Sequence, residues 1–254
     1  MRPEGRGGNP LWNAAAVFFW LLVWQLASLV VGMEILLPSP ASVLLRLGAL
    51  ARAPEYWSAV GFSLARITLG FLSAFCAGTA LAALARAYPP VGRLLAPLMG
   101  AMKAAPVVSY IILCLLLMPA SRLSAAVSFM MALPILYTNV LTGLFAVDAR
   151  LLEMAAVFDV PKGRRALFIV FPQTAPFLLS GVRLALGLCW KAGVAAEVIG
   201  LPRGSVGEGM YQAKIFVDSG SVLAWTVTVI ALSFALEQIG TGGIAALLRA
   251  LEKA

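Results

Sequence analysis

The amino-acid sequence predicts an all-α membrane protein with six transmembrane helices. Of its 254 residues, 61% are hydrophobic and only 12% are charged, a composition far outside that of soluble globular chains. A helix needs about 20 apolar residues to cross a bilayer. Six segments satisfy this requirement: 12–31, 60–85, 93–118, 122–146, 176–200 and 222–246. We therefore treat residues 1–254 as a single transmembrane domain.

The first segment could be a span or a signal peptide, because Arg2 and Arg6 precede its apolar run. That run is longer than the apolar region of most signal peptides, and no small-residue cleavage site follows it. We favour an uncleaved first span. After it, the turn Leu37-Pro38-Ser39-Pro40 leads into an apolar helical stripe, which we expect to lie along the membrane surface or to pack on the spans.

Small residues recur every four positions in the second and fifth spans. The second span carries Gly70, Ala74, Gly78 and Ala82, and the fifth carries Gly181, Ala185, Cys189 and Gly193. Small side chains at this interval let helix backbones approach closely, which holds helices together in lipid. We expect these stripes to form contacts within one subunit, with a seam between two subunits as the alternative.

The arrangement of Lys and Arg predicts that both termini lie in the cytoplasm. With that orientation, ten cations fall in inner segments: Arg2, Arg6, Arg86, Arg93, Arg150, Lys162, Arg164, Arg165, Arg249 and Lys253. Five fall in outer segments: Arg46, Arg52, Arg122, Arg203 and Lys214. Because cytoplasmic loops of membrane proteins carry an excess of Lys and Arg, the segment 148–172 is also predicted to be cytoplasmic.

Residues 148–172 form the one long charged interruption in the apolar sequence. They contain acidic and basic side chains, yet the run LLEMAAVF places apolar residues at helical spacing. Asp148 is placed to cap the start of this helix, and Asp159-Val160-Pro161 to end it and to open another. A short amphipathic helix between two spans is typical of a docking surface.

This segment resembles the cytoplasmic "EAA" loop of ABC importer permeases. Glu153, Ala155, Ile169 and Pro172 match the pattern of that loop, whereas Met154 replaces an Ala, Asp159 a Gly and Phe171 a Leu. The Gly position favours positive φ, which Asp also tolerates. The outer segment from Leu37 and the stretch AAEVIGLPRGSVGEG resemble the nitrate, sulfonate and taurine group of these permeases, so the resemblance extends over most of the chain.

The resemblance implies a type I ABC importer permease fold in a bacterial inner membrane. It also implies partners: a second permease subunit, expected to be a copy of this chain, two ATPase subunits and an extracytoplasmic solute-binding protein. ATP and Mg²⁺ would bind to the ATPase, so we expect no cofactor in this chain. The residues expected to couple this chain to the ATPase subunits are Glu153, Met154, Ala155, Ala156, Phe158 and Asp159, flanked by Arg164 and Arg165.

Three charged residues within the spans are candidates for the solute pathway. Lys103 and Lys191 fall near the middle of their predicted spans, and Glu197 lies one helical turn from the end of the fifth. A charge in hydrocarbon costs on the order of 3 kcal/mol, so such residues usually pair, reach the interface or face a watery cavity. A cationic lining for an anionic solute is one interpretation, and pairing with a neighbouring helix is the other.

The Gly-rich segment 200–214 is predicted to be an outer loop, because it has no apolar run. It could help to close the pathway, contact a solute-binding protein or be a plain connection. Gly here indicates flexibility and not phosphate binding, because no strand precedes it.

Several classes of protein are excluded by residues that the sequence lacks. There is no histidine, and the three cysteines form no metal-binding or disulfide pattern. No Lys follows a Gly, so a Walker A motif is missing, and catalytic pairs with histidine are impossible. The basic residues cluster at segment ends, as membrane anchors do, which argues against nucleic-acid binding.

Two other functions are weighed against the importer permease. A secondary transporter or channel would work without an ATPase, and Pro106 and Pro134 do interrupt predicted spans. That class usually carries ion-coupling carboxylates at the membrane centre, where this chain has few acidic residues. A membrane scaffold would explain the amphipathic loop and leave the central lysines unexplained.

Overall fold

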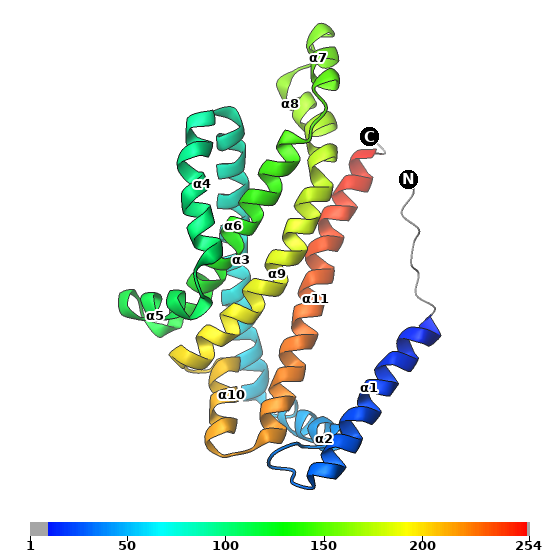
Figure 1. Ribbon diagram of the computed structural model, residues 1–254, viewed down its shortest axis with the longest axis vertical. Helices are drawn as coiled ribbons and strands as arrows, with labels where there is room; N and C mark the ends of the chain where they lie inside the picture. Colours follow the sequence, from blue (N-terminus) through cyan, green and yellow to red (C-terminus); the bar gives the residue numbers. More distant parts are fainter. Residues whose placement is uncertain (1–9, 253–254) are drawn as a thin grey trace.

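The computed structural model describes residues 10–252, and every regular element in that part of the chain is helical (Figure 1). Three of the counted cations, Arg2, Arg6 and Lys253, lie outside the described residues, as does the side chain of Arg249. The elements are α1 (Pro10–Val31), α2 (Pro40–Leu50), α3 (Pro54–Ala87), α4 (Pro89–Ala104), α5 (Val107–Leu117), the 3-10 turn Ala120–Arg122, α6 (Leu123–Phe145), α7 (Ala149–Val157), α8 (Lys162–Arg165), the π-helical turn Ala166–Val170, α9 (Phe171–Gly200), α10 (Val206–Ile215) and α11 (Ser219–Glu252).

Five helices are long and apolar enough to cross a membrane. They are Ala14–Val31 in α1, Pro54–Ala87, Ala120–Phe145, Lys162–Gly200 and Ser219–Ala246 in α11. Each contains or overlaps one of the predicted spans. The predicted span 93–118, which Pro106 was expected to interrupt, is not one straight helix, because α4 and α5 meet there at an angle of 103°. Counted as one broken span, this pair brings the total to the predicted six.

The break between α4 and α5 is caused by Pro106. Ala105, which precedes it, has an extended backbone with ψ 135°, as the residue before a proline prefers. Pro106 has no amide hydrogen to donate to the carbonyl of Met102 four residues earlier. The hydroxyl of Tyr110 takes that place and donates to the Met102 oxygen at 2.8 Å. As a consequence, Lys103 lies in the last turn of α4 and not in the middle of a helix.

The core is formed where α3, α6 and α9 cross, and small residues set these crossings. A Cβ added at Gly78 of α3 would lie 3.2 Å from the Cβ of Leu136 in α6. One added at Gly181 of α9 would lie 2.8 Å from the Cβ of Asn139, also in α6. Both distances are shorter than ordinary contacts, so a larger residue at either position would force its neighbours in α6 to shift. The prediction that the small-residue stripes pack within one subunit is confirmed for these helices.

The prediction that residues 200–214 form a loop is wrong, because α10 occupies most of this segment. The hydroxyl of Ser205 caps the helix by accepting a hydrogen bond from the amide of Glu208 at 3.0 Å. The Glu208 carboxylate in turn accepts from the amide of Gly204. This reciprocal pattern is close to a capping box, and its Ser-x-x-Glu spacing was visible in the sequence. α10 packs between α3, α9 and α11.

The helix predicted after the Leu37–Pro40 turn is α2, and it packs on α11. Ser39 caps it, Pro40 occupies its first position, and its residue Val43 is buried. α2 crosses the lower end of the bundle in Figure 1, on the side opposite α7.

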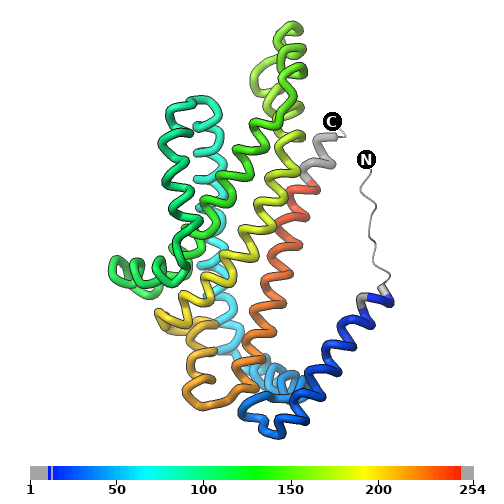
Figure 2. The backbone as a smooth tube through the Cα atoms, viewed as in Figure 1, coloured from blue at the N-terminus to red at the C-terminus, as the bar shows by residue number. Residues whose placement is uncertain are grey.

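α1 stands apart from the other spans, as the trace in Figure 2 shows. It is joined to the rest at its C-terminal end, where Trp24 donates to the carbonyl of Pro38 at 3.1 Å and Ser28 to that of Leu37 at 2.9 Å. Its apolar side chains are mostly exposed, including Phe18 at 63%. Such a helix has its apolar surface available to lipid or to another chain.

Candidate functional site

α7 begins at a side-chain cap, as the sequence predicted. The Asp148 carboxylate accepts a hydrogen bond from the amide of Arg150 at 2.8 Å. The amide of Asp148 donates to the side-chain oxygen of Gln173 at 2.9 Å, and the Gln173 nitrogen donates to the carbonyl of Ile169 at 3.1 Å. Gln173 lies in the first turn of α9, so these bonds fix the start of α7 against the end of a membrane span.

α7 ends in a left-handed turn at Asp159, which has φ +50°. The amide of Asp159 bonds the carbonyl of Ala156, and the amide of Val160 bonds that of Ala155. This pair of bonds is the Schellman motif, in which the left-handed position is usually glycine. The turn that the EAA pattern assigns to Gly is therefore preserved here with Asp.

Most of the predicted coupling residues lie on the open surface of α7, which projects past the bundle at the top of Figure 1. Met154 is 50% exposed and Phe158 is 74% exposed, although both are apolar. Glu153, Ala156 and Asp159 are exposed as well. Glu153 makes no ion pair with the residues that the structure describes, including Arg150.

Ala155 is the exception, since its side chain is only 1% exposed. The two flanking arginines also differ from one another. Arg165 donates through Nε to the carbonyl of Val160 at 2.6 Å and so supports the turn. Arg164 is exposed and free to contact another chain.

Lys103 and Lys191 have different surroundings. Lys103 lines a cleft between α3, α4 and α6 that has a volume of about 600 Å³. Lys191 lies on an exposed face of α9, although its neighbours Trp190 and Ala192 are buried. Neither lysine forms an ion pair within the described residues.

Glu197 is completely enclosed by the protein. One carboxylate oxygen accepts a hydrogen bond from the hydroxyl of Ser63 at 2.6 Å and a longer one from the amide of Gly207 at 3.4 Å. The same Ser63 hydroxyl accepts from the amide of Val206 at 3.0 Å. Ser63 belongs to α3, and Val206 and Gly207 begin α10, so Glu197 joins three helices. Sequence reasoning missed Ser63, which carries no distinguishing pattern.

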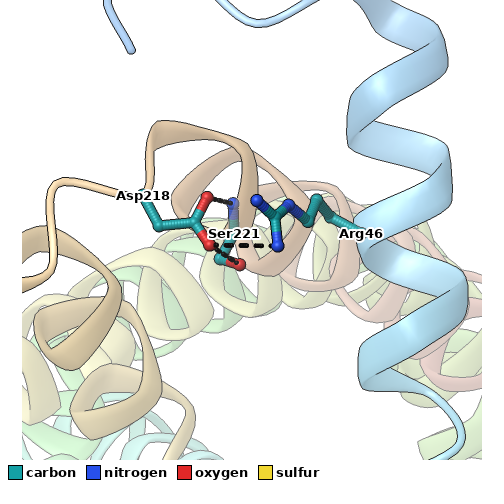
Figure 3. Close-up of polar contacts among 3 residues, drawn as sticks. All are labelled: Arg46, Asp218 and Ser221. Carbon is teal, nitrogen blue, oxygen red and sulfur yellow. Dashed lines mark hydrogen bonds and ion pairs between the residues drawn. The ribbon is translucent and has the colours of Figure 1, made fainter. Parts of the chain in front are cut away.

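Two ion pairs occur among the described residues. Arg183 of α9 and Glu237 of α11 lie 3.0 Å apart, which agrees with the interpretation that charges in the spans pair with neighbouring helices. The other pair joins Arg46 of α2 to Asp218, before α11, at 3.7 Å (Figure 3). Asp218 also accepts hydrogen bonds from the amide and hydroxyl of Ser221, at 3.1 and 2.8 Å.

Asp218 is held in its ionised form by these neighbours. Its partial burial opposes ionisation, but the hydrogen bonds from Ser221 and the positive charge of Arg46 outweigh that effect and lower the pKa of the carboxyl below its usual value. The pair therefore links α2 to the α10–α11 corner at neutral pH.

The amino-acid sequence matches a known protein family and is similar to several transport proteins. Residues 67–241 match the family described as "binding-protein-dependent transport system inner membrane component". The chain is 27% identical to the aliphatic sulfonates transport permease protein SsuC of Bacillus subtilis, over 88% of each chain. It is 26% identical to the taurine transport system permease protein TauC of Escherichia coli, over 84% of this chain and 80% of that one. It is also 26% identical to the nitrate import permease protein NrtB of Synechococcus elongatus, over 71% and 68%.

Proposed function

The chain belongs to the family of binding-protein-dependent transport inner membrane components, and from this membership we propose that it is the permease subunit of an ATP-driven importer. As a member of an ABC permease family it is a multi-pass protein of the bacterial inner membrane and a transport component, not an enzyme. The chain would form the solute pathway together with a second permease subunit, which we expect to be a copy of it. An extracytoplasmic binding protein would deliver the solute, and two ATPase chains would bind ATP and Mg²⁺.

The observation that carries this proposal is the exposed helix α7 with its left-handed end. Met154 and Phe158 expose apolar surface at a polar end of the molecule, where burial against another protein would be favourable. Glu153 directly precedes Met154 and has no ion-pair partner among the described residues, so it is available to a cationic or polar group of the ATPase. Ala156, Asp159 and Arg164 complete this surface, whereas Ala155 and Arg165 hold its shape.

ATP binding would move the two ATPase chains together, and the α7 helices docked on them would follow. The hydrogen bonds of Asp148 and Gln173 connect α7 directly to the first turn of α9. A displacement of α7 would thus reach the spans without passing through a flexible loop. This link supports a mechanism of alternating access.

The transported solute is proposed to be a small organic or inorganic anion, such as a sulfonate or nitrate, or a vitamin precursor. Lys103 and Lys191 would contribute positive charge to the pathway, since both are exposed in this subunit and have no acidic partner among the described residues. Relatives named for aliphatic sulfonates, taurine and nitrate support an anion. Glu197, being enclosed, would influence the pathway only through the packing of α9 and α10.

Uptake by right-side-out membrane vesicles that contain the permease and its ATPase, with the solute-binding protein added outside, tests the proposal. We expect uptake of labelled taurine or nitrate to require ATP, and Glu153→Lys to abolish it while the protein remains folded in the membrane. Glu55→Lys is the control, because it makes the same change at an exposed site on α3, at the end opposite α7. Uptake that continued without ATP, driven by an ion gradient alone, would favour the secondary transporter instead.

The proposed orientation places both termini and α7 in the cytoplasm. In a variant without native cysteines, Gly163→Cys after α7 should react with an impermeant thiol reagent only in opened vesicles, and Arg203→Cys before α10 should react in intact cells. Arg203 is the better outer site, because its neighbour Gly204 has φ +70° and would be strained by a side chain. The reverse pattern of labelling would place α7 outside the cell and contradict the importer assignment.

A further inference from the structure

The cleft that contains Lys103 carries two further cations. It is formed by one face of α4 together with the end of α3 and the second half of α6, and it holds about 600 Å³. Arg86 and Arg93 line it near the α3–α4 turn, and Lys103 lines it near the break that follows α4. Arg93 and Lys103 are ten residues apart, which is roughly 15 Å along a helix. The cleft is therefore elongated, with positive charge at both ends.

These three charges are not neutralised by the protein. None of the residues that line the cleft is acidic. The two ion pairs of the described chain lie elsewhere, at Arg46 and at Arg183. Arg86 is held at one wall, where Nε donates to the carbonyl of Leu144 at 3.4 Å and the guanidinium carbon lies 5.2 Å from the centre of the Phe145 ring. Arg86, Arg93 and Lys103 are exposed and have no acidic partner among the described residues, so their charges are available to an anion that enters the cleft.

Small residues on α4 keep the cleft open. Gly92, Ala96 and Gly100 occupy successive turns of the face that lines it. A Cβ at Gly100 would meet nothing within 4 Å, so the space in front of that residue is empty of protein. The opposite wall is provided by α6, where Tyr137 and Thr138 add hydroxyl groups to a mostly apolar lining. The cleft can thus accept an apolar body as well as a charged group.

We propose that this cleft binds an oxoanion group, a sulfonate or a phosphate, attached to a small apolar body. Arg binds such groups through two parallel hydrogen bonds, and Lys supplies a point charge. The same chemistry has two sources, namely the transported solute on its way to the cytoplasm and the phosphate of an anionic lipid. The first source rests on the proposed function, whereas the second does not.

Binding to the purified permease, without ATP or ATPase, tests this site. Labelled butanesulfonate and inorganic sulfate probe the solute source. Retention of phosphatidylglycerol, measured by mass spectrometry of the protein in mixed micelles with phosphatidylcholine, probes the lipid source. The double variant Arg93→Gln/Lys103→Met loses charge-assisted hydrogen bonds. We therefore expect it to bind whichever probe the unaltered chain binds about tenfold more weakly, or weaker still.

A steric variant separates the site from general electrostatics. Gly100→Phe keeps all three cations and fills the open space, so it should weaken binding as strongly as the charge variant does. Arg52→Gln is the control, because Arg52 is an exposed cation before α3 that does not line the cleft. Each variant must give a single symmetric peak in gel filtration.

The outcomes distinguish the sources. If both cleft variants weaken the binding of butanesulfonate or sulfate and Arg52→Gln leaves it unchanged, the cleft is assigned to the solute. The same pattern for phosphatidylglycerol alone assigns the cleft to lipid. If neither class binds, or if Gly100→Phe binds as tightly as the unaltered chain, the proposal is wrong. The binding assay contains no ATPase, so it does not depend on whether uptake requires ATP. In the same way, a permease that fails to bind these probes could still require ATP for uptake.

Discussion

Glu153 on α7 and Glu197 on α9 are carboxylates with opposite surroundings. Glu153 is exposed and unpaired within the described residues, whereas Glu197 is enclosed and bonded to Ser63 and to the start of α10. An enclosed carboxyl group can find hydrogen-bond partners only within its own subunit, because no solvent reaches it. A carboxylate on an exposed docking helix is instead available to another chain. Glu197 is therefore expected to stabilise the fold, whereas Glu153 is expected to contact another chain. Measurements of stability can test this difference.

The largest effect on stability is expected for Glu197→Ala. This change leaves the Ser63 hydroxyl and the amide of Gly207 without their acceptor and opens a cavity, so it should lower the free energy of unfolding by about 2–3 kcal/mol. Glu197→Gln retains an acceptor oxygen and should cost less. Thermal unfolding of the purified protein in detergent measures both. Equal midpoints for the alanine variant and the unaltered chain would show that Glu197 does not hold these helices together.

A smaller effect is expected at the turn after α7. Asp159 has φ +50°, a conformation that costs a residue other than glycine about 1–2 kcal/mol. Asp159→Gly should preserve coupling and leave stability unchanged or raised by about 0.5–1 kcal/mol. Asp159→Val should distort the turn and reduce ATP-driven uptake. Because Asp159 is exposed, loss of global folding in the valine variant would show that the turn belongs to the core and not to the docking region.

The smallest effect is expected at the ion pair between Arg46 and Asp218. Because the folded-state pKa of Asp218 is lowered, the pair stabilises the protein above the unfolded pKa of about 4, and this contribution is lost as pH falls through the folded value. Arg46 is 58% exposed and solvent screens the pair, so the contribution should be only about 0.2–1 kcal/mol. Unfolding midpoints of Asp218→Asn and the unaltered chain should differ at pH 7 and converge at low pH. A difference that stays the same as the pH is lowered from 7 into the acid range would exclude ionisation of Asp218 as its cause.

Local signals in the sequence predicted the ends of α7 and most of the spans. The Asp148 cap, the long apolar runs and the tolerance of Asp159 for positive φ are properties of neighbouring residues, which a sequence displays directly. The Ser205-x-x-Glu208 capping signal was equally local, but the absence of an apolar run hid α10. Glycine there serves close packing: a Cβ at Gly207 would lie 2.4 Å from the Cβ of Glu197.

Contacts between distant residues could not be predicted in this way. Ser63 and Glu197 are separated by 134 positions, and Arg86 meets the carbonyl of Leu144 across 58. Which side chains share a cleft depends on how the helices cross, and no single segment encodes that. Lys103 shows the same limit, because one proline moved it from the expected middle of a span to the end of a helix.

The hydrogen bond from Tyr110 to Met102 has a mechanical consequence. A proline break in a membrane helix often acts as a hinge, because the freed carbonyl can exchange partners. Here the phenol spans the break and occupies that carbonyl at 2.8 Å. Bending at Pro106 would expose an oxygen to hydrocarbon, which is costly. The helices α4 and α5 should therefore rotate together as one unit. We expect that a rotation of α4 would displace α5 sideways in the membrane.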